Sequence, residues 1–428
     1  MSRFPHPEVD LPRPQPPGGV EKSRPRALAA ALTALAALAA TGLVAGPAAA
    51  TPYGGGCALE RTSVHHSEGL DTWNGSYPQP RKRLDAVMVF LSFPDAEPQT
   101  SPAELAADHF PATTRFFERA SYGRFQLVPH PQRRWVRMPH ASTSYAIQRD
   151  WSAAHRSQYL RDALRAADPV TDFSKYDVVY LVADPDAPGV DSDATKVVNF
   201  DRPMRADGTD IGRIVTVFEQ HPPDRNVLAH ETGHVFDLPD LYHRPADGKG
   251  DWDTYVGDWD VMGSQFGLAP DLFAWHKWKL GWLDPRQVRC VGTAGPNRFT
   301  LEPLSSGPRT RGTAFGTGDG TKLAVIRTGR SSAIAVEARG GTGNDSATCT
   351  RGILVYRVDS DSTSGEGPMQ VLDTHPRTGA CYGESVYPAL ADAPLEVGES
   401  YTVPGEPIRI EVEDRTPSGS WNVKITTG

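Results

Sequence analysis

The first half of the chain alternates continuous apolar runs with segments of helical periodicity. Three runs have the length and composition of buried strands: 85–91, 176–182 and 211–218. Helices are predicted at 103–119, with an interruption at Pro111, and at 152–167. This alternation predicts a mixed α/β (α+β) domain.

The pattern changes towards the C-terminus. A last helix is predicted at 270–281, where the bulky residues are expected to pack in the core: Phe273, Trp275, Trp278 and Leu280. From about 299 the chain consists of short apolar runs separated by turns rich in Gly, Ser and Thr, which predicts a β-sandwich. We therefore expect an N-terminal extension at 1–50, a catalytic domain at 51–298 and a β-sandwich domain at 299–428.

The N-terminal extension has the pattern of a secretory signal. Residues 27–46 are apolar, three basic residues precede them (Lys22, Arg24 and Arg26), and Ala48-Ala49-Ala50 follows. A basic region, an apolar region and small residues favour cleavage after Ala50 over a permanent membrane anchor, although twenty apolar residues are long enough to span a bilayer. The expected product is secreted and extracellular, without stable membrane association.

The net charge of the chain indicates which classes of binding partner are expected. The whole chain carries a net charge of −8, and removal of residues 1–50 leaves 39 basic and 49 acidic side chains, a net charge near −10. A chain this acidic is not expected to bind nucleic acid or anionic membranes, whose phosphates require basic surfaces.

Four cysteines suit an oxidising, exported setting. They lack the spacing of a structural zinc site, and their positions favour one disulfide between Cys349 and Cys381 and another between Cys57 and Cys290. The alternative is a latent form in which Cys57 blocks a catalytic metal. The even number of cysteines favours two plain disulfides.

Residues 230–240, HETGHVFDLPD, carry the most informative chemistry. His230 and His234 are four positions apart, so on a helix both imidazoles lie on one face and can share a metal ion. Two neutral nitrogen ligands suit Zn²⁺, and Glu231 between them is placed to act as general base on a water at that ion. This combination is typical of metal-assisted peptide hydrolysis.

The residues around the motif predict the helix that carries it. Pro222 and Pro223 exclude helix before Asp224, which is expected to cap a helix that begins at Arg225. The helix should end near Asp237, because a following proline disfavours helical geometry at the residue before it.

A catalytic zinc ion keeps three protein ligands and one open position. Asp240, six residues after His234, is the predicted third ligand because the chain must reverse at the end of the helix. A glutamate on a later helix is the rival design, but no Glu occurs between Glu231 and Glu302. Other candidates are less well spaced: His243, Asp247, Asp251, Asp253, Asp258, Asp260, Asp271 and His276.

Several motifs resemble known families. The pattern HExxHxxGxxH/D followed by a methionine turn marks metzincin-type zinc proteases, and 258–264 (DWDVMGS) is similar to that turn. More narrowly, five stretches resemble the immune inhibitor A family of secreted bacterial metalloproteases: FFERASYGRFQL at 116–127, LPDLY at 238–242, DVMGS at 260–264, AWHKWKLGWL at 274–283 and GILVYRVD at 352–359. They occur in the family's order between about 84 and 360.

This resemblance implies a set of roles. His230, His234 and Asp240 would bind zinc, Glu231 would be the catalytic base, and Met262 would form a hydrophobic floor. In metzincin-like enzymes a strand such as 211–218 borders the cleft, where a sheet edge pairs with extended substrate.

One position departs from the family pattern, because Asp237 stands where the family has Gly. We expect a left-handed turn that Asp tolerates. An Asp237→Gly change should then leave zinc content unchanged and stability equal or slightly higher.

Each feature also has a plainer interpretation. The two histidines alone are compatible with a solvated helix face, and Met262 alone with ordinary core. The acidic residues Asp247, Asp251, Asp253, Asp258 and Asp260 suit Ca²⁺, but they lack the EF-hand pattern, so a solvated or structural loop remains an equal alternative.

Together the motifs predict a secreted zinc endopeptidase that acts on protein or peptide substrates. One alternative is a secreted surface- or carbohydrate-binding protein with an inert metal site, but Glu231 argues against it, since a structural site does not need that carboxylate. Another is a zinc hydrolase of non-peptide amides.

Overall fold

The computed structural model describes residues 55–245, 249–307 and 320–428. The first sheet has the order β2-β1-β3-β5-β4. Its strands are β1 (Arg83–Ser92), β2 (Gln126–Arg137), β3 (Val178–Ala183), β4 (Lys196–Ala206) and β5 (Thr209–Val217). The three predicted apolar runs are β1, β3 and β5, which pair in parallel at the centre of the sheet.

The strand at the edge differs from the sequence-based expectation. β5 does not lie at the edge of the sheet, because β4 pairs with it in antiparallel orientation. β4 contains Pro203, and proline within sheets is confined largely to edge strands and bulges because it cannot donate to the ladder. The edge next to the metal motif is therefore β4.

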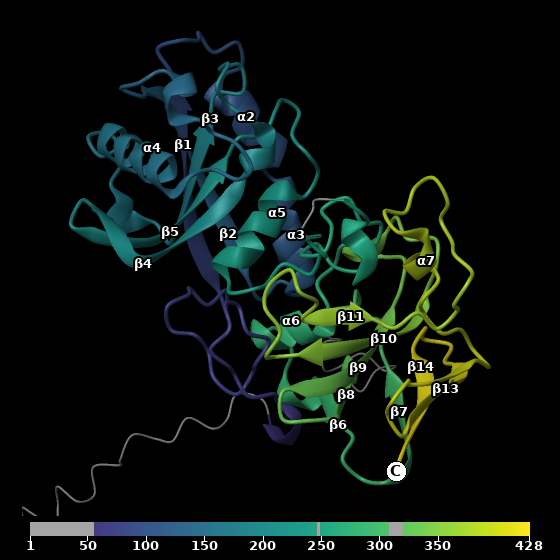
Figure 1. Cartoon of the computed structure of the whole chain (residues 1–428). Helices are drawn as coiled ribbons and strands as arrows, with labels where there is room; N and C mark the ends of the chain where they lie inside the picture. Colours follow the sequence, from purple (N-terminus) through teal and green to yellow (C-terminus); the bar gives the residue numbers. More distant parts are fainter. Residues whose placement is uncertain (1–54, 246–248, 308–319) are drawn as a thin grey trace, which may run out of the picture. The chain divides into compact units, whose positions relative to one another are not determined.

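Helices cover both faces of this sheet (Figure 1). The α-helices are α2 (Pro102–His109), α3 (Ala112–Ala120), α4 (Ala153–Ala167), α5 (Val227–Val235), α6 (Ala274–Lys279) and the single turn α7 (Pro388–Ala391). Short 3₁₀ turns are η1 (Gly55–Cys57), η2 (Ser142–Tyr145), η3 (Phe173–Lys175), η4 (Ser192–Ala194), η5 (Trp252–Thr254), η6 (Pro285–Gln287) and η7 (Gly343–Asp345). The predicted helix at 103–119 is two helices, separated at Pro111, and α6 is shorter than the predicted 270–281.

Alternation along β1 explains the layers. Ala86, Met88 and Phe90 pack into the core beneath α2, α3 and α5, whereas the residues between them, such as Val87 and Val89, pack towards α4. Successive side chains of a strand point to opposite faces, so a continuous apolar run is what a sheet covered on both faces requires.

The C-terminal part is rich in strands. They are β6 (Val288–Cys290), β7 (Gly295–Leu301), β8 (Leu323–Arg327), β9 (Ser332–Arg339), β10 (Gly352–Asp359), β11 (Met369–Val371), β12 (Ser400–Thr402), β13 (Ile408–Arg415) and β14 (Trp421–Thr427). They form two sheets, β11-β10-β9-β8-β6 and β12-β13-β14-β7, with one shared apolar core. The β-rich C-terminal region is thus as expected, although β6 and most of β7 precede residue 299.

Two disulfides join distant parts of the chain. Cys57 is bonded to Cys290, and Cys349 is bonded to Cys381. These are the pairs that the sequence favoured. Cys57 is therefore not a free thiol beside the metal motif, as the latent form would require.

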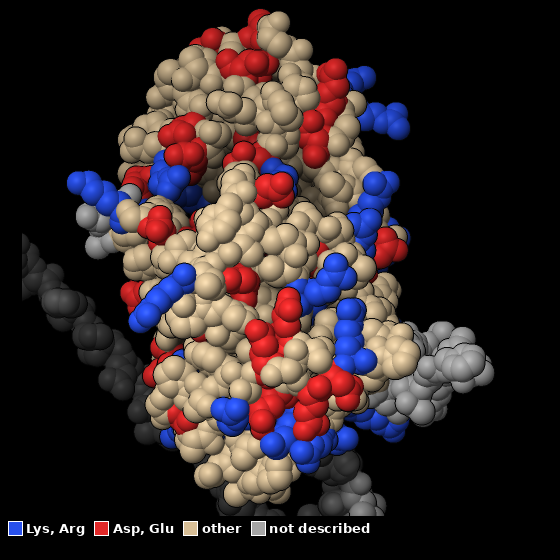
Figure 2. All heavy atoms as spheres, turned by 90° about the vertical axis from the view of Figure 1, so that its right-hand side faces the viewer, with Lys and Arg blue, Asp and Glu red and all other residues tan. Residues whose placement is uncertain are grey.

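The predicted signal segment at 27–46 lies outside the described residues. Among the residues that the structure describes, no helix is both long and apolar enough to cross a bilayer. On the face shown in Figure 2, Lys and Arg side chains are interspersed with Asp and Glu.

Candidate metal centre

Helix α5 carries the HETGH motif and begins later than the sequence predicted. Asp224 is not its cap: the helix starts at Val227, after Asn226, whose φ of 58° is left-handed and whose side chain makes no capping hydrogen bond. Asn tolerates this conformation better than most residues. All nine residues of α5 are buried, so packing rather than capping holds this helix in place.

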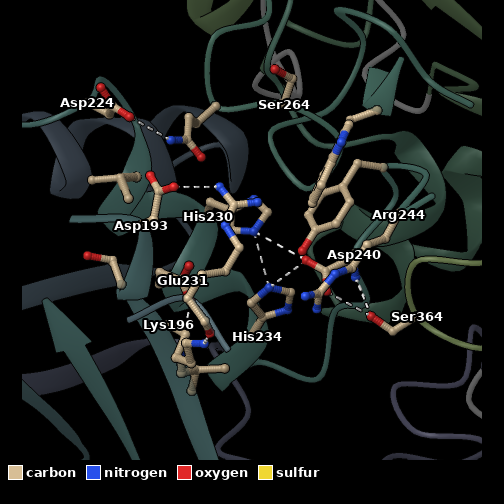
Figure 3. Close-up of a pocket in the computed structure, with 18 of the residues that line it drawn as sticks. Asp193, Lys196, Asp224, His230, Glu231, His234, Asp240, Arg244, Ser264 and Ser364 are labelled. Carbon is tan, nitrogen blue, oxygen red and sulfur yellow. Dashed lines mark hydrogen bonds and ion pairs between the residues drawn. The ribbon is translucent and has the colours of Figure 1, made fainter. Parts of the chain in front are cut away.

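The three predicted metal ligands converge at one point (Figure 3). Nε2 of His230 and Nε2 of His234 lie 3.2 Å apart. Oδ1 of Asp240 lies 3.4 Å from the first and 3.0 Å from the second. Within the described part of the chain, His230, His234 and Asp240 are the one group of His, Cys, Asp or Glu residues whose atoms are close enough to hold a metal ion.

These spacings fit a tetrahedral zinc ion. Zn–N and Zn–O bonds of about 2.0–2.2 Å place neighbouring ligand atoms about 3.3 Å apart. The other ring nitrogen of each histidine is fixed, because Nδ1 of His230 lies 2.8 Å from the carbonyl oxygen of Val261 and Nδ1 of His234 lies 2.8 Å from that of Leu238. Each Nδ1 therefore donates, which leaves both Nε2 atoms directed at the third ligand.

The electrostatics of the three residues call for a positive charge among them. Oδ1 of Asp240 is buried and has no hydrogen bond of good geometry. Burial alone would raise the pKa of Asp240, but the two histidines outweigh it and hold it well below its usual range. Burial likewise opposes protonation of His234, yet Asp240 raises its pKa to about 9. Either a proton or a metal ion between these residues would balance the negative charge of the Asp240 carboxylate.

Glu231 lies beside the three ligands in a pocket of about 750 Å³. The backbone N–H of Val197, on edge strand β4, donates to its Oε2 at 2.7 Å. Burial raises the pKa of Glu231, and the neighbouring histidines only partly oppose that effect. A carboxylate with a raised pKa in a pocket is suited to accept and return a proton.

Met262 lies directly beneath α5. A Cβ atom added at Gly233 would be only 2.3 Å from its Sδ atom, so the methionine side chain packs closely against the helix where glycine leaves room for it. Gly233 lies between the two histidines in the sequence, and Met262 is fully buried. The structure thus places Met262 where a floor under the ligand-bearing helix would lie.

Asp237 is more than a tolerated turn residue. Its φ is 65°, as the left-handed turn predicted. Its carboxylate, however, is fully buried, accepts from Nη2 of Arg61 at 2.5 Å and lies 2.9 Å from Nδ1 of His66. The ammonium of Lys279 donates to its backbone oxygen at 2.7 Å. The expectation that Asp237→Gly is harmless overlooked these buried partners, which lie far away in the sequence.

Asp240 is held by the C-terminal part of the chain. The hydroxyl of Ser364 accepts from the backbone N–H of Asp240 at 2.8 Å and donates to its Oδ2 at 3.2 Å. The backbone N–H of Gly365 donates to the carbonyl oxygen of Asp240 at 3.0 Å. No sequence pattern marks this loop, so its contact with Asp240 could not be predicted.

Tyr242 and Trp252 form an aromatic wall of the pocket. The ring of Tyr242 stacks on His230, with centroids 6.2 Å apart, and contacts Trp252 at 5.4 Å. Burial and the negative charges of Asp240 and Glu231 raise the pKa of Tyr242 above its usual range. Its hydroxyl therefore remains a hydrogen-bond donor within the pocket.

The acidic residues considered for Ca²⁺ do not come together in the described structure. Asp258 accepts the backbone N–H groups of Leu268 and Val386. Asp260 accepts those of Met262 and Phe273. Asp251 directly precedes the short 3₁₀ turn η5 and Asp253 lies within it, and neither belongs to a described group that could hold a metal ion. Asp247 lies outside the described residues. Asp258 and Asp260 therefore act as structural acceptors.

Comparison with known proteins adds little. No protein-family model and no curated protein sequence matches the chain. Among solved structures, wild-type OgpA from Akkermansia muciniphila in two crystal forms is 11% and 10% identical, with TM-scores of 0.27 and 0.26; the matches cover 71% and 70% of this chain and 95% of each OgpA chain. Catalytically inactive OgpA in complex with an O-glycopeptide is 11% identical, with a TM-score of 0.24, over 71% of this chain and 94% of that one. Likeness this slight identifies neither fold nor activity.

Proposed function

We propose that the protein is a secreted zinc-dependent endopeptidase, similar in its site to metzincin-type enzymes and in its motifs to the immune inhibitor A family. One observation carries the proposal. Three metal-ligating atoms, from His230, His234 and Asp240, converge at the spacing of a tetrahedral site, beside a buried carboxylate in an open pocket.

A zinc ion held by these three residues would supply a Lewis acid that polarises the scissile carbonyl and acidifies a water molecule. Glu231 takes the proton of that water and later passes it to the leaving amine. Its raised pKa suits the first step, because a carboxylate with a raised pKa is a stronger base towards the proton of water. The hydrogen bond from Val197 fixes the carboxylate in the pocket.

The rival interpretations find less support in the site. An inert binding protein has no need of a buried general base beside the metal ligands. The pocket is open and about 750 Å³ in volume, and an edge strand borders it. An exposed sheet edge can pair with an extended peptide through main-chain hydrogen bonds. This arrangement favours peptide over small non-peptide amides.

The experiment that tests the proposal combines metal analysis of the secreted protein with a protein-digestion assay. We expect one zinc ion per chain, loss of digestion with a chelator and recovery when zinc is returned. A zinc-free protein, or digestion that a chelator does not affect, would overturn the proposal.

A further inference from the structure

The segment 57–70 passes alongside the metal helix and is tied down at several points. Its first residue, Cys57, is bonded to Cys290. The backbone N–H of Leu70 donates to the carbonyl oxygen of Leu59 at 2.9 Å, which closes the segment into a loop. The hydroxyl of Ser67 donates to the carbonyl oxygen of Ser360 at 2.6 Å. The loop is therefore anchored to the C-terminal part as well as to itself.

At the tip of this loop, His66 meets the turn that follows the metal helix. Nδ1 of His66 lies 2.9 Å from Oδ1 of Asp237, and both residues have left-handed backbone, with φ of 57° and 65°. Non-glycine residues adopt this conformation rarely and at a cost, and such residues cluster at functional sites. The imidazole of His66 also stacks on His234, with ring centroids 5.7 Å apart and 25° between the planes.

The contact with Asp237 reaches the metal ligand in two steps. Asp237 directly precedes Leu238, whose carbonyl oxygen accepts from Nδ1 of His234. That hydrogen bond fixes the orientation of the imidazole and directs its Nε2 at the other ligands. A shift of the Asp237–Leu238 turn would therefore rotate the imidazole of His234. His66 contacts both the turn, through Asp237, and the imidazole of His234.

We infer that His66 is a positioning residue for the metal centre. The loop 57–70 holds His66 in place and is therefore required for metal binding. The inference rests on the proposed zinc site and goes beyond it, because the HETGH motif does not include His66. Groups that orient metal ligands typically contribute 10- to 100-fold to metal affinity.

Two substitutions at position 66 separate the hydrogen bond to Asp237 from the ring contact with His234. His66→Phe keeps a ring against His234 but loses the donor to Asp237. His66→Asn loses the ring but keeps a donor of similar reach, and Asn tolerates left-handed backbone. A matched control is His155→Gln, since His155 is an exposed residue on α4, outside the pocket.

Zinc affinity of the full chain, measured by competition with a chelator, is the primary measurement. We expect His66→Phe to weaken zinc binding by about 10- to 100-fold, His66→Asn to weaken it less, and His155→Gln to leave it unchanged. Digestion by His66→Phe should recover in excess zinc, with KM close to that of the wild type. A residue with a purely structural role would not give this recovery.

A second variant keeps the inference testable if His66→Phe does not fold. Arg61→Met removes the other donor to the carboxylate of Asp237 and does not substitute residue 66 itself. Loss of a positive charge near the site should by itself favour zinc, so weaker zinc binding by Arg61→Met indicates lost positioning.

The outcomes distinguish the two proposals. If the wild type binds zinc and His66→Phe binds it equally well, while its metal-free form unfolds more easily, His66 is only structural and the inference is wrong. If the wild type binds no zinc, the proposed function itself fails.

Discussion

The backbone N–H of Val197 donates a 2.7 Å hydrogen bond to Oε2 of Glu231, so the edge strand β4 and the proposed general base are in direct contact. Val197 follows Lys196, the first residue of β4, and lies 34 positions before Glu231. A peptide that adds to the edge of β4 would therefore extend past Glu231. If substrate pairs with β4 as proposed, the strand would connect the placement of the peptide with the chemistry proposed for Glu231.

The first prediction concerns Glu231→Gln. The amide oxygen of glutamine can accept the hydrogen bond from Val197, so the fold and the zinc content should stay near those of the wild type. Glutamine cannot accept the proton of water, and loss of a general base typically lowers turnover by at least about 10²-fold. His230→Ala and His234→Ala should lose zinc as well as digestion. Wild-type turnover by Glu231→Gln would show that the proposed mechanism is wrong.

The second prediction concerns the third ligand. Asp240→Ala removes one of three ligand atoms, so zinc affinity and digestion should fall together, and Asp240→His should partly restore both, because imidazole also binds zinc. Ser364→Ala is a milder test, since it removes two hydrogen bonds to Asp240, at its backbone N–H and its Oδ2, but keeps the carboxylate itself. Metal content measured after dialysis should rank wild type, Ser364→Ala and Asp240→Ala in decreasing order.

The convergence of His230, His234 and Asp240 could be predicted from sequence because they lie within eleven residues, where helix periodicity and one turn set the distances between them. The partners of those residues could not. Arg61 and His66 reach Asp237 across 176 and 171 positions, and Ser364 reaches Asp240 across 124. No local pattern encodes contacts of that range.

In the fold, too, some elements could be predicted from the local sequence pattern and others could not. The buried central strands are recognisable as apolar runs, whereas β4 is polar and interrupted by Pro203, so its pattern did not identify it as a strand. The sequence therefore assigned the edge position to β5. Pro203 is the feature of β4 that is typical of an edge strand, and the sequence-based expectation did not take it into account.

The third prediction reverses the sequence-based expectation for Asp237→Gly. Glycine relieves a left-handed strain of roughly 1 kcal/mol. It also removes a fully buried carboxylate from Arg61 and His66, and breaking a buried pair typically costs about 3–5 kcal/mol. The variant should unfold at lower urea concentration than the wild type. A higher unfolding midpoint would mean that the buried pairs contribute little.

The fourth prediction concerns pH. His276 is fully buried between Glu68 and Asp260, with its ring nitrogens 2.8 and 3.0 Å from their oxygens. Burial opposes its protonation, but the two carboxylates outweigh it and raise the pKa to about 9. Because the folded pKa lies above the unfolded value near 6.5, the proton stabilises the fold fully below pH 6.5, and this contribution is lost as the pH rises through about 9.

Urea unfolding of the wild type and of His276→Gln at several pH values tests this. The difference in unfolding free energy should be largest near pH 6 and should narrow up to about pH 9.5. Comparing the two proteins cancels groups that titrate in both, such as His234. A difference that stays constant across this range would show that His276 is neutral in the folded protein.

The last prediction separates the two disulfides. Closing a loop restricts the unfolded chain more as the loop lengthens, and the separations are 233 residues for Cys57–Cys290 and 32 for Cys349–Cys381. On loop entropy alone, removing the first should cost about 5 kcal/mol and removing the second about 4 kcal/mol. Each pair is replaced together by serine, so that no free thiol remains, and peptide mapping without reduction first checks the pairing.

The two disulfide variants should differ more in metal binding than in stability. Cys349→Ser/Cys381→Ser should bind zinc as the wild type does, whereas Cys57→Ser/Cys290→Ser releases the anchor of the loop that carries His66 and should bind zinc more weakly. Equal zinc affinity in the two folded variants would show that the loop holds its place without its covalent anchor.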